Sequence, residues 1–177
     1  LSYLSKIVRP DYVVLTGVGF SHIEFFKSTK DIAKAKAEIF RDPIISDKKT
    51  RYAYINLKSK HYDILEKTAL KKHYKVLPYE GESGVDQNMQ GCFALGQHFG
   101  LSELEINRGL SEYQASSHRL ELINLKEALL IDDTYNSNPD GVAYALAALR
   151  QYSGRKIAVI GDMLELGDQA QELHDGL

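Results

Sequence analysis

The chain has little cysteine, little net charge and no long apolar segment. Its 177 residues include one cysteine, Cys92, which excludes an internal disulfide framework and any metal site built from several cysteines. No apolar run approaches the roughly 20 residues that a membrane-spanning helix needs. With 22 basic and 24 acidic side chains the formal net charge is −2, which argues against a dedicated nucleic-acid surface.

What is present is an ordinary globular composition, 44% hydrophobic and 26% charged, which excludes disordered and coiled-coil chains. The length fits one to two domains. The chain opens without an initiator methionine, and it has neither the basic lead nor the long apolar stretch of a signal peptide, so we expect a cytoplasmic protein. The spacing of Leu1, Leu4 and Val8 is that of the end of an amphipathic helix, so we expect the chain to be a piece of a longer one.

Short apolar strands alternate with helical segments, a pattern that predicts an α/β fold with a mainly parallel sheet. We predict strands at residues 12–16, 52–57 and 75–77, and helices at 28–40, 61–72, 87–99 and 102–113. Two of these helices begin with capping-box pairs: Ser28 with Asp31, and Ser102 with Glu105.

The pattern changes near Ser116, where we place a domain boundary. The segments predicted beyond it are a strand pair at residues 120–123 and 128–131, a helix at 139–152 and a buried strand at 156–160. Asn138 is the expected N-cap of that helix, and Pro139 its first residue.

Three polar loops follow predicted strands, at residues 17–22, 132–138 and 161–167. In open α/β sheets, ligands bind beyond the carboxyl ends of the strands, so these loops are the candidate sites. In the first loop, His22 could ligate a divalent metal with Glu24 orienting it, although a lone loop histidine is more often a surface residue. The second loop could bind phosphate or sugar hydroxyls ahead of a helix, or simply form a capped turn. The third is also common turn material.

Seven elements of the sequence, taken in order, carry a family resemblance: PDYVVLT (10–16), SHIEFF (21–26), IAKAKAEI (32–39), Asn88, SHRLE (117–121), DDTYNSNP (132–139) and GDMLELG (161–167). Together they resemble the Mur ligase family, and most closely its branch that adds D-alanyl-D-alanine to a UDP-MurNAc-tripeptide. The resemblance spans nearly the whole chain, residues 41–87 excepted. The resemblance implies that residues 1–116 form the later part of a central P-loop-type ATPase domain. Residues 117–177 would then begin a Rossmann-like C-terminal domain.

The resemblance also implies a reaction. ATP with Mg²⁺ would phosphorylate the terminal carboxylate of UDP-MurNAc-tripeptide, and the amine of D-Ala-D-Ala would attack the acyl phosphate. His22 matches the family's metal-binding histidine, and Lys36 matches a lysine that carries a carbamate beside the metal. Arg119 matches a nucleotide-contacting arginine at the hinge between domains, for which we also expect a catalytic role. The other positions that match nucleotide contacts are Asn88, Asp133, Tyr135, Asn136 and Asn138.

Helical spacing favours Lys36 over Lys34 as the functional lysine. The two residues lie about 200° apart around the helix, so only one can face a site. Lys36 lies at the edge of the apolar face that Ala33, Ala37 and Phe40 form, whereas Lys34 lies further towards solvent. A solvated helix-surface lysine is the alternative interpretation of Lys36.

Two other functions stay open at this point. One is a related Mur or folyl-polyglutamate type ligase with another amine substrate, against which the DDTYNSNP string argues. The other is a non-catalytic nucleotide-binding module, which the sequence upstream of this chain would test. The family's Gly-rich phosphate loop is not in these 177 residues, so we expect them to be inactive alone, and we expect the protein to be a monomer. The stretch between the Lys36 and Asn88 helices is shorter than in the family, so either residues are missing around 42–46 and 81–87 or the protein is a trimmed member.

Overall fold

A computed structural model describes residues 1–42, 49–82, 84–114 and 116–177. The chain divides into two compact units. Unit 1 comprises Leu1–Gly19 and Phe26–Ser111, and unit 2 comprises Phe20–Phe25 and Glu112–Leu177. The expected deletion around residues 42–46 lies almost wholly outside the described residues. No helix in the described ranges is long and apolar enough to cross a membrane.

Unit 1 is built on a three-stranded parallel sheet in the order β1-β2-β3. The strands are β1 (Tyr12–Leu15), β2 (Arg51–Asn56) and β3 (Tyr74–Tyr79), so the three strands predicted here are confirmed. Ala53, Tyr54 and Ile55 of the central strand are at most 1% exposed. Such a continuous buried run is typical of a parallel strand that is covered on both faces.

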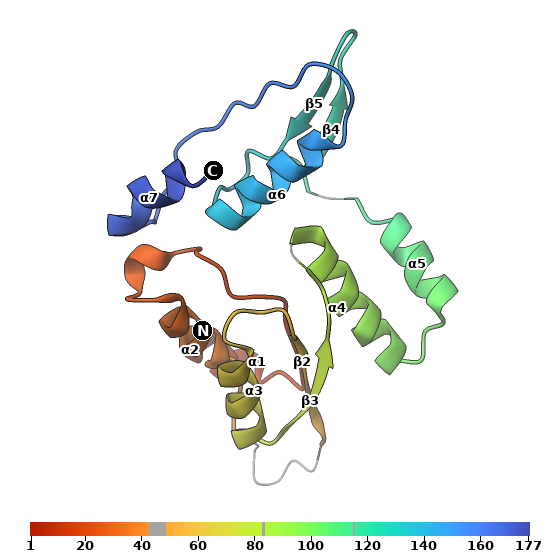
Figure 1. Cartoon of the computed structure of the whole chain (residues 1–177). Coiled ribbons are helices and arrows are strands. Elements are labelled where there is room, and N and C mark those ends of the chain that lie inside the picture. The colour runs from red at the N-terminus through yellow and green to blue at the C-terminus, as the bar shows by residue number, and fades with distance from the viewer. Residues whose placement is uncertain (43–48, 83, 115) are drawn as a thin grey trace. The chain divides into compact units, whose positions relative to one another are not determined.

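Helices cover both faces of this sheet (Figure 1). α2 (Thr29–Ala37) and α3 (Tyr62–Lys71) lie on one side and form the crossovers between successive strands. α4 (Gly84–His98) lies on the other side, and α5 (Glu103–Ser111) packs against it. The crossovers bring the carboxyl ends of the three strands to one edge, where the loops that follow them begin.

The capping pairs that the sequence suggested start two of these helices. Ser28 Oγ accepts a hydrogen bond from the Asp31 backbone nitrogen at 3.3 Å, and Ser102 Oγ accepts one from the Glu105 backbone nitrogen at 3.3 Å. Helix ends were less well predicted. α2 ends at Ala37 instead of residue 40, because its last turn tightens into bonds between residues three apart.

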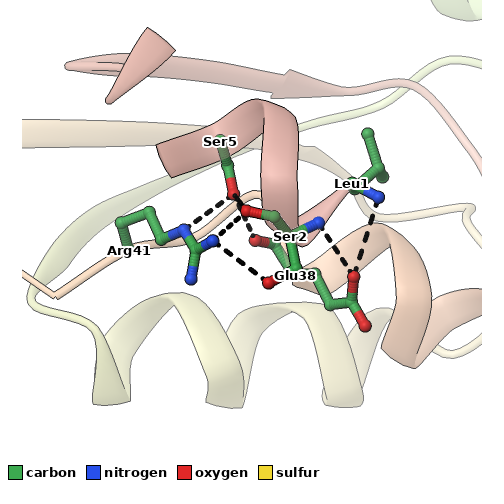
Figure 2. A network of polar contacts seen from close by, with 5 residues as sticks. All are labelled: Leu1, Ser2, Ser5, Glu38 and Arg41. Atoms are coloured by element: carbon green, nitrogen blue, oxygen red, sulfur yellow. Dashed lines mark hydrogen bonds and ion pairs between the residues drawn. The ribbon is translucent and has the colours of Figure 1, made fainter. Parts of the chain in front are cut away.

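A polar network ties α1 (Ser2–Val8) to the end of α2 (Figure 2). Ser5 is 4% exposed, and its hydroxyl donates to the Glu38 carbonyl oxygen at 3.0 Å and accepts from Arg41 Nε at 2.7 Å. Ser2 donates its backbone N–H to Glu38 Oε2 at 2.9 Å, and its carbonyl oxygen accepts from Arg41. The network fixes the helix that leads into β1.

The described residues of unit 2 form an antiparallel hairpin and two helices. Its strands are β4 (Glu121–Asn124) and β5 (Leu129–Asp132), which confirms the predicted strand pair. α6 (Pro139–Arg150) starts as predicted, since the Asn138 side chain accepts from the Gly141 backbone nitrogen at 2.9 Å. The remaining elements are the short helix α7 (Ala170–Asp175) and the 3₁₀ turns η1 (Ile23–Phe25) and η2 (Gly167–Gln169).

The predicted strand at residues 156–160 is wrong. These residues have no regular structure and are all exposed, Val159 by 94%. A strand needs neighbours that satisfy its backbone and cover its side chains. No strand in the described part of the chain pairs with this segment, so its apolar composition was not enough to make it one.

Candidate functional site

One buried amide holds together the carboxyl edge of the unit 1 sheet. Asn56, the last residue of β2, is 1% exposed. Its Nδ2 donates to the carbonyl oxygens of Thr16 at 3.0 Å and Gly81 at 2.7 Å. Its Oδ1 accepts from the backbone nitrogens of Gly81 and Lys58, both at 3.1 Å. A single side chain therefore joins the segments that follow all three strands.

Two glycines at this edge allow α4 to pack closely against the loops. A Cβ on Gly81 would lie 2.5 Å from the Cα of Gln87, and one on Gly17 would lie 2.9 Å from Gln87 Oε1. The loops after β1 and β3 therefore lie directly against the first turns of α4. Asn88, the next residue of that helix, is exposed.

Lys36 approaches the same edge from α2. Its Nζ donates to the Gly17 carbonyl oxygen at 2.8 Å, and burial lowers the pKa of its ammonium below the ordinary value. The Lys34 side chain is 58% exposed and pairs with Asp31 at 2.7 Å. Because only a neutral amine reacts with CO₂, the partly desolvated Lys36 is chemically better suited to carbamate formation than Lys34.

His22 lies in unit 2, just before η1, with a left-handed backbone (φ 63°). Its Nδ1 is hydrogen-bonded to a carboxylate oxygen of Glu165, and the Glu165 carbonyl oxygen accepts from the Glu24 backbone nitrogen at 3.0 Å. The carboxylate that orients His22 therefore comes from Glu165, and the sequence-based choice of Glu24 is wrong. Glu24 lies on the 3₁₀ turn itself and meets Glu165 through its backbone. The Nε2 atom is then the ring nitrogen that could bind a metal.

Apolar packing supports this contact between the SHIEFF and GDMLELG strings. Ile23, Met163 and Leu166 are each at most 3% exposed. A Cβ on Gly167 would lie 3.1 Å from Glu24 Cβ, so the two segments approach closely there. The third polar loop is thus the surface on which the first one packs.

Arg119, Asp133 and Tyr135 form a second candidate cluster in unit 2. Arg119 Cζ lies 4.0 Å from the centroid of the Tyr135 ring, a cation–π contact. Asp133 Oδ1 accepts from the Leu120 backbone nitrogen at 3.1 Å, and burial raises the pKa of this carboxyl above its ordinary value. A guanidinium suits phosphate, an aromatic ring suits a base, and a carboxylate suits ribose hydroxyls.

The two amides of the same loop differ in their surroundings. Asn138 accepts from the Gly141 backbone nitrogen at the start of α6, the structural role that the sequence offered as an alternative. Asn136 is exposed. The structure therefore places Arg119, Asp133 and Tyr135 together, with Asn136 and Asn138 on the following turn.

A further polar cluster beside Arg119 was missed at the sequence level. His118, Glu121 and Asp132 bring potential metal-ligand atoms within 4.8 Å of one another. His118 Nδ1 is hydrogen-bonded to Asp132 Oδ2 at 2.8 Å, and Glu121 Oε2 accepts from the His118 backbone nitrogen at 2.9 Å. The bond raises the pKa of the His118 imidazole and lowers that of the Asp132 carboxyl. These contacts satisfy the cluster without a cation.

A parallel sheet whose carboxyl edge carries polar loops is typical of α/β nucleotide-binding proteins. Residues 1–121 match the Mur ligase middle domain, and residues 118–177 match the Mur ligase glutamate ligase domain. The chain belongs to the Mur ligase family.

Curated relatives carry one name, UDP-N-acetylmuramoyl-tripeptide–D-alanyl-D-alanine ligase. The protein of that name from Haemophilus influenzae is 28% identical over 207 residues, covering 98% of this chain and 44% of the relative. The one from Bacillus subtilis is 27% identical over 202 residues, with the same coverage. The chain thus spans less than half the length of these relatives. The first match extends over 30 more residues than the chain has (207 − 177), so the relative has residues in this region that the chain lacks.

Solved structures agree in fold. A crystal structure of MurF from Acinetobacter baumannii superposes with a TM-score of 0.85 at 26% identity, covering 98% of this chain and 44% of that one. MurF from Thermotoga maritima, solved in complex with ADP, has a TM-score of 0.79 at 24% identity, covering 99% of this chain and 47% of that one.

Proposed function

We propose that the whole protein is an ATP-dependent ligase that joins D-Ala-D-Ala to UDP-MurNAc-tripeptide. The observation that carries this proposal is the match of 98% of the chain to relatives that bear the name of this ligase. We assign residues 1–116 to the later part of the central domain and residues 117–177 to the beginning of the C-terminal domain. The proposal includes a monomer in the cytoplasm.

The proposed reaction has two steps. The γ-phosphoryl group of ATP passes to the terminal carboxylate of the tripeptide, which gives an acyl phosphate and ADP. The amine of D-Ala-D-Ala then attacks the carbonyl carbon, phosphate leaves, and the amine loses a proton as the amide forms. The first step brings two anions together, and the second builds negative charge on the carbonyl oxygen and the leaving phosphate, so both need positive charge that is already in position.

Lys36 and His22 are the proposed metal-side residues. Mg²⁺, when bound, would offset the charge of the phosphates and of the acceptor carboxylate. The surroundings of His22 fit this role, because its Nδ1 is held by Glu165 and its Nε2 is left as the ligand atom. Lys36 fits because it is partly desolvated and lies at the carboxyl edge of the sheet. Its carbamate would supply an anionic ligand that an ammonium cannot.

Most of the proposed nucleotide contacts lie in unit 2. Arg119 would bind phosphate through its guanidinium, and Asp133 would accept from ribose hydroxyls. Tyr135 offers a ring for contact with the base. The centroid of this ring lies 4.0 Å from Arg119 Cζ, so the two groups share one surface. Asn88 on α4 and the amides Asn136 and Asn138 complete the proposed set.

The test uses the whole purified protein with ATP, Mg²⁺ and UDP-MurNAc-tripeptide. Adding D-Ala-D-Ala should release phosphate and give a product whose mass equals the two substrates less water. Single amino acids, glutamate among them, are tested in place of D-Ala-D-Ala as alternative amine substrates. Phosphate release with one of these but not with D-Ala-D-Ala would establish a different ligase. Nucleotide binding without release under any condition would establish a non-catalytic module.

A further inference from the structure

The backbone on both sides of Arg119 is strained. His118 and Leu120 have positive φ angles of 64° and 51°, a region that residues with a side chain seldom adopt. A non-glycine residue in this region carries a conformational cost and persists only where surrounding contacts enforce it. The contacts that enforce it here therefore decide where Arg119 points.

Apart from the bond between the His118 backbone nitrogen and Glu121, these contacts run to the loop that carries the other nucleotide-contact candidates and to the strand end before it. Tyr135 donates its backbone N–H to the His118 carbonyl oxygen at 3.0 Å, and Leu120 donates its own to Asp133 Oδ1 at 3.1 Å. The His118 side chain adds the 2.8 Å bond to Asp132 at the end of β5. Asp132 is itself held, since its Oδ1 accepts from Thr134 Oγ1 at 2.8 Å.

We propose that His118 and Asp132 form a clamp that positions Arg119 over Tyr135 and so prepares this surface for a nucleotide. The nucleotide part of this inference rests on the proposed function, whereas the positioning part does not. His118 and Asp132 are positioning residues: they act through Arg119 and Tyr135 and touch no reacting atom.

The clamp has a definite charge balance. The imidazole of His118 faces two carboxylates, Asp132 and Glu121, and it is followed in sequence by the Arg119 guanidinium. The Asp132 bond raises the His118 pKa, and Glu121 adds to the rise. The charged form of the clamp is therefore complete below the ordinary histidine value of 6.5, and it is lost as the pH rises through the raised value. Positioning of Arg119 should weaken over the same range.

Two substitutions of His118 separate the side chain from the backbone. His118→Gly removes the clamp but accepts a positive φ without strain, and His118→Gln keeps a polar side chain that cannot be charged. His73→Gln is the matched control, because His73 is also an exposed histidine with positive φ (59°) and it lies in unit 1. Arg119→Ala gives the reference for complete loss of the guanidinium.

The experiment measures two quantities on the whole protein. The first is the NMR shift of the Arg119 side-chain protons, which the Tyr135 ring displaces when the two are stacked. The second is the Kd for ATP with Mg²⁺ between pH 6 and 9. We expect His118→Gly to lose most of the ring-induced shift and to weaken ATP binding by about fivefold, with His73→Gln unchanged. The ratio of wild-type to His118→Gln affinity should fall as the pH rises.

The outcomes are distinguishable. An unchanged Arg119 shift in His118→Gly would overturn the clamp, whatever happens to ATP binding. A lost shift with unchanged ATP affinity would overturn its link to the nucleotide. If the wild-type protein shows the shift but binds no ATP, the proposed function fails while the positioning of Arg119 by His118 stands on the shift alone.

Discussion

Asn56→Ala tests whether one amide holds the carboxyl edge of the unit 1 sheet. The substitution removes hydrogen bonds to Thr16, Lys58 and both polar backbone atoms of Gly81. Water can replace the part-buried contacts to Thr16 and Lys58, but the two bonds to Gly81 are buried. Leaving a buried polar group without a partner costs about 1–3 kcal/mol. Two such groups predict a loss of about 2–6 kcal/mol in the free energy of unfolding.

Asn56→Asp should be more damaging than Asn56→Ala at neutral pH. The aspartate has nearly the same shape, but it cannot donate, so its carboxylate oxygen would replace Nδ2, which now lies 3.0 and 2.7 Å from two carbonyl oxygens. A buried charge facing two acceptors costs more than an unpaired amide. Which of the two variants is less stable therefore distinguishes the loss of the amide's hydrogen-bond donors from the loss of side-chain volume.

The assay is urea unfolding of the 177-residue chain, followed by circular dichroism, with equal slopes required for comparison. Asn107→Ala is the control, because Asn107 is an exposed residue of α5; its midpoint should stay close to wild type. The reasoning is refuted if Asn56→Ala shifts the midpoint no more than Asn107→Ala does. An aspartate variant more stable than the alanine variant would refute the donation argument alone.

Two further predictions concern α2. In the whole enzyme, Lys36→Ala should abolish ligation, and short carboxylic acids added to this variant should restore part of the activity. Lys34→Ala should stay near wild type. Equal activity of the two variants in a phosphate-release assay would contradict the assignment of Lys36. Hydrogen bonds from Lys34 and Ser28 lower the pKa of Asp31 below its ordinary 3.8, so its stabilising contribution exists above pH 3.8 and is lost as the pH falls through the lower folded value. Asp31→Asn should therefore flatten the acid side of a plot of urea midpoint against pH, and an unchanged acid side would argue against it.

Much of the fold could be predicted from the sequence because the signals that mark it are local. A capping serine and its acidic partner stand three residues apart, so Ser28 and Ser102 identify two helix starts without any knowledge of the rest of the chain. The helix predicted at residues 87–99 stops just before Gly100, whose φ of +79° is a conformation that glycine favours after a helix end. The apolar β-branched run at residues 12–16 identified β1 for the same reason.

The features that could not be predicted depend on partners far away in the sequence. Asn56 looks like an ordinary strand-end amide until Thr16 and Gly81 are placed beside it, 40 and 25 residues away. Glu165 lies 143 residues from His22, whereas the sequence-based choice, Glu24, was merely the nearest carboxylate. The segment at 156–160 has the composition of a strand, but composition supplies no pairing neighbour.

The backbone angles of the structure give information on the candidate site residues that the sequence alone does not give. Among the described residues, Arg9 and His73 have positive φ just after α1 and α3, where such a conformation is routine, and His61 has it at the N-cap of α3. The other non-glycine residues with positive φ lie outside helix ends, in strings that carry the family resemblance: His22, His118, Leu120 and Glu165.

Leu120 is the most telling of these residues, because leucine has no polar side chain that could stabilise a left-handed backbone. The Asp133 carboxylate holds it through the Leu120 backbone N–H at 3.1 Å. Asp133 is also a proposed nucleotide contact, and burial raises the pKa of its carboxyl. A ligand that bonds to this carboxylate would compete for the atom that enforces the strain. The conformation around Arg119 is therefore expected to respond to occupation of the site, which a rigid surface loop would not do.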